Sequence, residues 1–271
     1  MVSTVDDLGL ERATGLIGAW VCNFELGAPG NPARSGTLLR ALSEHGVLFF
    51  DFGRAPEAAE YTEFAGLFGN VQAVFGQQVK NQDEDAVPLI DSRRMPMKEH
   101  LINRWHSDGG PLEVPPLAAI LTPYELPEAG GDTMWSSMYA AYDALSPTFQ
   151  AMLDGLRIVN NNKLASFLEP KEHIHPAVVR NPVTGRKCLF YNPNYTECFV
   201  GLTDTENDVL CRFLTEHINT PEFHVRLNWK LGYVAVWHQQ VTQHRGVADF
   251  TGPRKLKRLT VDGAPLIPAN G

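Results

Sequence analysis

The sequence predicts a mainly β protein with flanking helices, arranged as a β-sandwich or jelly roll. Short stretches of alternating apolar and polar residues dominate the C-terminal third, as in strands with one buried face. Only a few segments show helical periodicity. A doubly wound parallel sheet is disfavoured, because the chain lacks both a regular alternation of strands with helices and a glycine-rich phosphate loop.

The N-terminal part contains two predicted strands and two predicted helices. Residues 14–26 alternate in polarity as a strand does, and residues 36–45 carry leucines on one helical stripe that ends at Gly46. Residues 47–50 are short and wholly apolar, as expected for a buried strand. A second helix is predicted over about 57–68, where aromatic side chains recur on one face.

The segment from about 76 to 103 is polar, mixed in charge and without a sustained period. A loop of that length in a compact domain is usually functional or disordered. Because it leads directly into a histidine-containing motif at 106, we expect it to act as a lid over a site there. The alternative is a solvated excursion without a role.

The remaining elements follow in order. Thr203 and Glu206 form a capping box, which predicts a helix to about Ile218. A single helix is also predicted near 138–155. Gly130-Gly131 marks a turn. The predicted strands cover residues 117–122, 132–136, 176–192 with a turn at Gly185, 223–229, 233–237 and 256–261.

The composition is that of a globular protein with a sizeable core, 44% hydrophobic and 20% charged over 271 residues. Its net charge of −8 argues against general binding to nucleic acid or anionic membranes. The four cysteines lack C-x-x-C spacing, so neither a zinc knuckle nor a disulfide framework is indicated. With no secretory leader and no apolar run of membrane-spanning length, we expect a cytoplasmic protein with reduced thiols.

The most informative motif is His106-Ser107-Asp108. Two residues apart on a strand, His106 and Asp108 would point to the same side, as two ligands of one metal must. Two imidazoles and one carboxylate form the facial triad of non-haem Fe(II) sites. His-x-Asp is a weak motif by itself, however. Nine histidines offer several third ligands, and spacing alone does not single out His244.

Other histidines are weaker candidates for a metal site. His173 and His175 share a face but lack a carboxylate two residues on, so a surface or packing role is the default. His238 lies six residues before His244, where a core role or a role in supporting a ligand is favoured.

Two arginines follow the last histidine, at positions 254 and 258. Four residues apart on a strand, both guanidinium groups could point into the same mouth of the fold, as fixed cations for acidic small molecules. The alternative is a pair of surface arginines on a solvated strand.

Three blocks of sequence carry a family resemblance: Trp105-His106-Ser107-Asp108, Gly130-Gly131-Asp132-Thr133-Met134-Trp135, and the spacing from Trp237 through His244 and Asp249-Phe250 to Arg254 and Arg258. In this order they resemble the taurine/2,4-dichlorophenoxyacetate dioxygenase family of Fe(II)- and 2-oxoglutarate-dependent oxygenases. The resemblance runs over nearly the whole chain. It implies one domain over residues 1–271 with a cupin-like double-stranded β-helix as its jelly-roll core.

The resemblance also implies site residues. The implied iron ligands are His106, Asp108 and His244. Thr133 and Arg254 would hold the distal carboxylate of 2-oxoglutarate, with Lys255 as the rival of Arg254 because one gap must be placed before it. Arg258 matches the arginine that binds the anion of the prime substrate.

The chain departs from the family after Trp237, where His238-Gln239 replaces the usual Asp-Asn. We expect this change to alter how the distal histidine is held, without removing a ligand. Asp108 leaves no space for a halide, so halogenation is disfavoured.

The predicted substrate is a small, partly apolar organic acid. The positions that help to hold the sulfonate in the taurine enzymes are mostly apolar in this chain, so taurine fits poorly. The apolar body would lie against Val74, Phe75 and Ile102, with the anion on Arg258.

Together these features predict a dioxygenase that uses Fe(II), 2-oxoglutarate and O2 to hydroxylate an unactivated C–H bond, with succinate and CO2 as co-products. Desaturation or cyclisation in a biosynthetic pathway is the alternative within this class. A zinc hydrolase with the same triad and a catalytically silent binding barrel are alternatives from other classes. The resemblance also implies a homo-oligomer.

Overall fold

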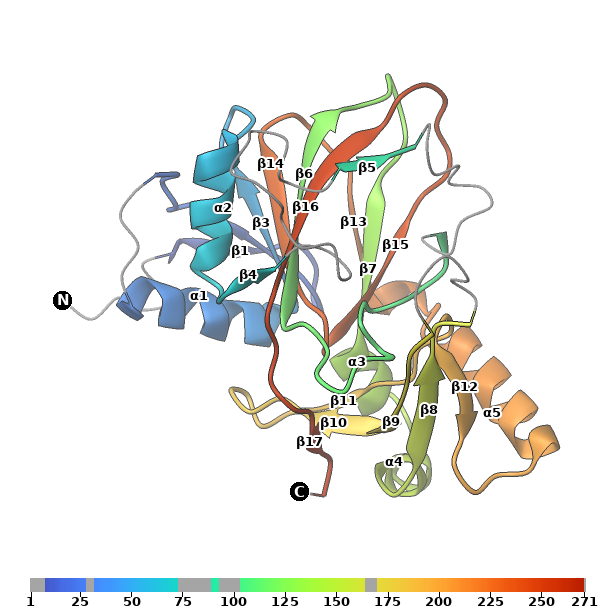
Figure 1. The fold of residues 1–271 in the computed structure, drawn as a ribbon. Coiled ribbons are helices and arrows are strands. Elements are labelled where there is room, and N and C mark those ends of the chain that lie inside the picture. Colours follow the sequence, from blue (N-terminus) through green and yellow to red (C-terminus); the bar gives the residue numbers. More distant parts are fainter. Residues whose placement is uncertain (1–7, 28–31, 73–88, 93–102, 164–169, 271) are drawn as a thin grey trace.

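The computed structural model describes residues 8–27, 32–72, 89–92, 103–163 and 170–270 (Figure 1). Within them the fold is mainly β with a jelly-roll core and flanking helices, as predicted. Among these described residues, no helix is both long enough and apolar enough to cross a membrane.

The larger sheet forms one wall of the jelly roll. Its strand order is β1-β2-β3-β14-β6-β16-β4, with β5 paired to β16, and only the β2–β3 pair is parallel. The bounds are β1 Leu10–Arg12, β2 Ala19–Val21, β3 Val47–Asp51, β4 Val71–Gln72, β5 Leu89–Asp91, β6 Ala118–Glu125, β14 Tyr233–His238 and β16 Lys255–Val261.

A three-stranded antiparallel sheet in the order β13-β7-β15 forms the opposite wall (Figure 1). Its strands are β13 His224–Leu227, β7 Thr133–Ser137 and β15 Thr242–Gly246. The two walls pack through large apolar side chains. The rings of Phe49 on β3 and Trp135 on β7 lie 5.5 Å apart, and Trp237 on β14 lies 5.8 Å from Trp135. Rigid aromatic packing of this kind fixes the positions of polar groups held between the sheets.

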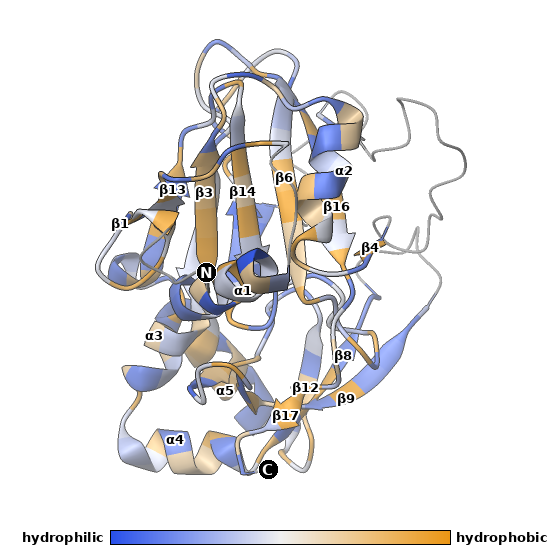
Figure 2. Cartoon of the chain, turned by 90° about the vertical axis from the view of Figure 1, so that its left-hand side faces the viewer, coloured by the Kyte–Doolittle hydropathy of each residue, from blue (hydrophilic) through white to orange (hydrophobic). Residues whose placement is uncertain are grey.

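Two helices cover the outer face of the larger sheet, α1 Pro32–His45 and α2 Ala58–Gly66 (Figure 2). Leu48 and Phe50 of β3 pack in the apolar cluster on this helical side, whereas Val47 and Phe49 pack between the two sheets. A strand buried on both faces needs apolar residues at every position, which is why residues 47–50 show no alternation.

The remaining elements form a third region below the two walls (Figure 1). Two small antiparallel sheets run in the orders β11-β10-β17 and β12-β8-β9. The bounds are α3 Met138–Asp143, α4 Pro147–Asp154, β8 Arg157–Asn161, β9 Glu172–Pro176, β10 Val178–Arg180, β11 Lys187–Leu189, β12 Thr196–Phe199, α5 Asp204–His217, a 3₁₀ turn Pro221–Phe223 and β17 Ile267–Pro268.

Two predicted elements were wrong in extent. The single helix expected near 138–155 is two helices, because Ser146 caps a new one and Pro147 occupies its first turn. The strand expected over 14–26 is limited to Ala19–Val21 and follows a separate strand, β1. Two other predictions were confirmed. Helix α1 ends before Gly46, whose φ is 74°, and α5 begins with the predicted capping box.

Candidate metal centre

His106, Asp108 and His244 converge in the space between the two walls. All three side chains are buried, and their ligand atoms lie within 4.8 Å of one another. His106 Nε2 is 3.9 Å from Asp108 Oδ1, and His244 Nε2 is 3.7 Å from Asp108 Oδ2. Within the described part of the chain, no other group of His, Cys, Asp and Glu meets this spacing.

The backbone brings these residues together in a way that differs from the prediction. His106 forms a single antiparallel bridge to β15: its N–H donates to the carbonyl of His244 at 3.1 Å, and the reverse bond is 2.7 Å long. Asp108 lies in a turn rather than on a strand. At Gly109, φ is 72° and a Cβ would collide with Pro116, so the chain reverses there and no strand continues.

The chemistry of the donor set fits a divalent metal ion. His106 Nδ1 lies 2.7 Å from the carbonyl of Arg104, which favours the tautomer that leaves the Nε2 lone pair free. Burial, and next the neighbouring imidazole of His106, hold the pKa of His244 well below its usual range, which favours the neutral imidazole that a metal ligand must be.

Asp108 has two further partners. Gln239 Nε2 donates to Asp108 Oδ2 at 2.5 Å, and Arg258 Nη2 also donates to this oxygen. Burial opposes ionisation of Asp108, but the Arg258 charge and the two nearby imidazoles outweigh it and hold the pKa of the carboxyl well below its usual range. The side chain is therefore an ionised carboxylate in a buried site.

A second polar cluster lies at the mouth formed by β7 and the start of β16. Thr133 Oγ1 accepts hydrogen bonds from Trp229 Nε1 at 3.0 Å and from Arg254 Nη2 at 3.3 Å. Because this hydroxyl already accepts two hydrogen bonds, its own proton is available to a further acceptor. Arg254 is 3% exposed, and burial lowers the pKa of its guanidinium to about 10, so it remains a cation.

The turn at Gly130-Gly131 sets the position of Arg254. The guanidinium donates through Nε to the carbonyl of Gly131 at 2.6 Å, and Asp249 accepts the Gly131 N–H at 2.9 Å. Lys255 is not in this cluster, because its ammonium group pairs with Glu125 at 2.5 Å. Of the two predicted rivals, only Arg254 reaches Thr133.

Several contacts of these clusters were not predicted from the sequence. Trp229 was predicted only to lie in the strand over 223–229, and its hydrogen bond to Thr133 had no sequence signal. Gln239 was expected to influence the distal histidine, whereas its side chain contacts Asp108. Ser92, in the predicted lid, exchanges two hydrogen bonds of 3.0 Å with the backbone of Arg254.

The other predicted residues divide into two groups. Val74, Phe75, Ile102 and most of the predicted lid at 76–103 lie outside the described residues. Of the alternative histidines, His175 packs with its Nε2 2.9 Å from the carbonyl of Leu112. His238 is buried beside Asn181 in the core and contributes no ligand atom to the triad.

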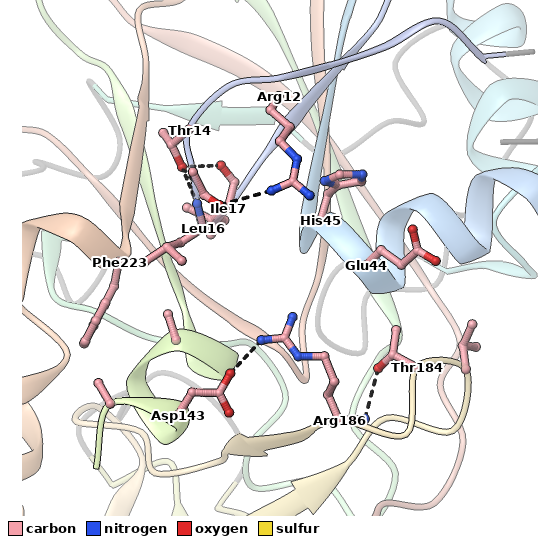
Figure 3. A pocket seen from close by; sticks show the side chains of 14 residues that line it. Arg12, Thr14, Leu16, Ile17, Glu44, His45, Asp143, Thr184, Arg186 and Phe223 are labelled. Carbon is pink, nitrogen blue, oxygen red and sulfur yellow. Dashed lines mark hydrogen bonds and ion pairs between the residues drawn. The ribbon is translucent and has the colours of Figure 1, made fainter. Parts of the chain in front are cut away.

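The described residues line two sizeable cavities, and these differ in whether they reach the triad. One of about 290 Å³ reaches Asp108, and its lining combines the apolar side chains of Leu112, Val114, Pro116 and Val261 with the polar ones of Gln72, Thr260 and Asp262. A larger one of about 750 Å³ lies elsewhere, among Arg12, Glu44, Arg186 and their neighbours, and includes no member of the triad (Figure 3). Of these two cavities, only the smaller one reaches a member of the triad.

A jelly roll that carries two imidazoles and a carboxylate between its walls is typical of non-haem metal-dependent oxygenases. The family model described as "Taurine catabolism dioxygenase TauD, TfdA family" matches residues 9–260, and the chain belongs to this family. It is an α-ketoglutarate-dependent dioxygenase, an oxidoreductase that uses Fe(II), 2-oxoglutarate and O2.

Individual relatives cover almost the full chain. An alkylsulfatase of Acinetobacter baylyi is 29% identical, over 97% of this chain and 88% of its own length. An α-ketoglutarate-dependent sulfate ester dioxygenase of Pseudomonas putida is 27% identical, over 98% of this chain and 93% of its own. The crystal structure of a taurine dioxygenase from Burkholderia xenovorans is similar with a TM-score of 0.83 and 28% identity, over 97% of this chain and 93% of that one.

Proposed function

We propose that His106, Asp108 and His244 bind the Fe(II) ion. The main support is that the Nε2 atoms of the two buried imidazoles both lie within 4 Å of the buried, ionised carboxylate. Bound there, the metal would supply the activation of O2 by which 2-oxoglutarate and the substrate are oxidised. The protein's own part is to hold the ligands in a fixed, dry geometry.

We further propose that Thr133 and Arg254 hold the distal carboxylate of 2-oxoglutarate. The support is a buried guanidinium beside a hydroxyl whose proton is free to donate. Two such donors suit the two oxygens of a carboxylate. Because Gly131 and Ser92 fix Arg254 through its side chain and backbone, little entropy would be lost when the co-substrate binds.

The proposed substrate is a small organic acid with an apolar body, anchored by Arg258. Arg258 Nε is buried and has no hydrogen-bond partner among the described residues, so one donor remains for a substrate anion. The cavity at Asp108 offers four apolar side chains, Leu112, Val114, Pro116 and Val261, against which the rest of the molecule could pack. Relatives named for sulfate esters and for taurine support an anionic substrate, and the contacts predicted for Val74, Phe75 and Ile102 stay predictions.

The proposed reaction is hydroxylation of an unactivated C–H bond. One oxygen atom of O2 enters the substrate as a hydroxyl group and the other enters succinate, while C1 of 2-oxoglutarate leaves as CO2. Desaturation or cyclisation consumes the same co-substrates but leaves no oxygen atom from O2 in the product. We also propose that residues 1–271 form a single catalytic domain, since the third region packs directly beneath the two walls.

Anaerobic addition of Fe(II) and 2-oxoglutarate tests the ligand assignment. Wild-type protein should develop the weak visible charge-transfer band of the chelate, and His106→Ala should lose it because one of three ligands is gone. A band of unchanged intensity in that variant would refute the assignment.

Replacement of Arg254 separates co-substrate binding from metal binding. We expect Arg254→Ala to raise the dissociation constant for 2-oxoglutarate by at least tenfold, since a buried charge-assisted pair is lost, and to leave Mn(II) affinity nearly unchanged. Titration calorimetry measures both constants, with Lys255→Ala as the control because Lys255 pairs with Glu125. Equal losses in both constants would count against the role of Arg254.

A panel of carboxylates, sulfonates and sulfate esters tests the substrate class through substrate-dependent succinate formation. Members with an apolar body should be turned over in preference to taurine, and mass analysis of products formed under ¹⁸O₂ distinguishes hydroxylation from desaturation. Preference for taurine itself would refute the proposed class.

A further inference from the structure

Gln239 holds Asp108 at two points. Its side-chain Oε1 accepts a hydrogen bond from the Asp108 main-chain N–H at 3.0 Å, and its Nε2 donates to Asp108 Oδ2 at 2.5 Å. Gln239 and Asp108 are 1% and 3% exposed, so water does not compete for these bonds. An amide bonded to both the backbone and the carboxylate of one residue fixes the rotation of that carboxylate relative to its own main chain.

The turn that carries Gln239 is itself anchored. Gln239 donates its main-chain N–H to the carbonyl of Leu117 at 2.9 Å, at the edge of β6. The preceding residue, His238, donates its main-chain N–H to the carbonyl of Gly46 at 2.9 Å. The amide that holds Asp108 therefore extends from the rigid larger sheet, while His244 stands on the opposite wall.

The two oxygens of Asp108 are in different environments. Each oxygen lies near one imidazole, Oδ2 3.7 Å from His244 Nε2 and Oδ1 3.9 Å from His106 Nε2, but only Oδ2 also accepts hydrogen bonds from Gln239 and Arg258. An oxygen that accepts two hydrogen bonds has both lone pairs engaged, which leaves Oδ1 as the better metal ligand.

We propose that Gln239 is a positioning residue of the metal centre, which occupies Asp108 Oδ2 and so presents Oδ1 to the metal. This inference rests on the proposed ligand role of Asp108. Where the family usually has Asp-Asn, this chain has His238-Gln239. The glutamine amide stands one methylene further from the backbone than an asparagine amide, and in this chain that reach is used to contact Asp108.

The test is the affinity for Mn(II), measured by titration calorimetry on the full chain. Gln239→Met keeps the length and volume of the side chain but removes both hydrogen bonds, and we expect it to weaken Mn(II) binding about 10- to 100-fold. The matched control is Gln240→Met, the same change one residue along the turn, at a buried side chain that does not hydrogen-bond to Asp108. The control should bind Mn(II) within about twofold of wild type.

A second readout separates positioning from a purely structural role. With Asp108 reoriented, the charge-transfer band of the anaerobic Fe(II)–2-oxoglutarate chelate should shift in Gln239→Met. A structural role alone would lower the melting temperature and leave the band of the folded fraction unmoved. If Gln239→Met does not fold, Gln239→Asn, which keeps the amide but shortens its reach, takes its place with the same expectations.

Unchanged Mn(II) affinity and an unshifted band in a folded Gln239 variant overturn the inference. His106→Ala, measured alongside, distinguishes this failure from failure of the ligand assignment. If His106→Ala loses the metal while the Gln239 variants keep it, the triad stands and only the role of Gln239 is wrong. If both retain the metal, the ligand assignment itself is wrong.

Discussion

At the scale of single residues, the site depends on side chains that hold other side chains. Arg254 has its guanidinium fixed by the carbonyl of Gly131 and its backbone by Ser92, and Asp249 in turn holds the Gly131 N–H. The side chain proposed to bind the co-substrate is therefore fixed before binding, as efficient recognition of a small dianion requires.

Gly131→Ala tests this arrangement. The φ of Gly131 is 73°, and a Cβ there would lie 3.0 Å from Arg254 Cδ and 3.1 Å from its Nε, so the guanidinium must move. We expect the dissociation constant for 2-oxoglutarate to rise about tenfold, corresponding to about 1.4 kcal/mol. Gly185→Ala is the control, because its φ is 70° and no atom lies within 4 Å of the added carbon. Similar losses in both variants would indicate backbone strain alone.

At the scale of elements, local signals and tertiary packing have separate roles. The capping box of α5 is complete: Glu206 N–H donates to Thr203 Oγ1 at 3.4 Å, and Glu206 Oε2 accepts the Thr203 N–H at 2.8 Å. This helix packs on the third region, away from the triad (Figure 1). Its stability should therefore be separable from the chemistry.

Thr203→Ala tests that separation. Loss of an N-cap hydroxyl should lower the free energy of unfolding by about 1 kcal/mol, while affinities for metal and 2-oxoglutarate remain unchanged. Urea denaturation measures the stability, and Thr205→Ala, an exposed change in the same helical turn, should have a much smaller effect. A loss of 2-oxoglutarate affinity in Thr203→Ala would show that α5 is coupled to the site.

At the scale of the whole molecule, buried histidines make folding sensitive to acid. Burial lowers the pKa of His238 to about 4, and its Nδ1 accepts the main-chain N–H of Gln240 at 3.3 Å. The folded state therefore keeps His238 neutral at pH values where the unfolded chain, with a histidine pKa near 6.5, is protonated. The contribution to stability is complete above about pH 6.5 and is lost as the pH falls toward 4.

Wild type should therefore lose stability more steeply in acid than the His238→Asn variant does. Over the window from about pH 6.5 to 4, the free energy of unfolding of wild type should fall by about 3 kcal/mol more than that of the variant. Urea denaturation at a series of pH values measures the difference. Parallel curves for the two proteins would mean that His238 does not titrate between the two states.

The sequence by itself determined the fold class, most element positions and the residue types of the site. Periodicity is a local property, so the alternation in β13 and β16, the apolar run of β14 and the capping box of α5 were readable without a structure. Resemblance to the family also placed His106, Asp108, His244, Thr133 and Arg254 in one site, and the fold brings them together in two adjoining clusters.

Only the tertiary structure decided which groups contact which. Gln239 and Asp108 are 131 positions apart, and Trp229 is 96 positions from Thr133. No local pattern encodes a hydrogen bond between such distant residues, because it depends on how the fold brings separate segments of the chain together. The tertiary structure also decided between Arg254 and Lys255. At the start of β16 the side chain of Arg254 reaches Thr133, whereas that of Lys255 pairs with Glu125.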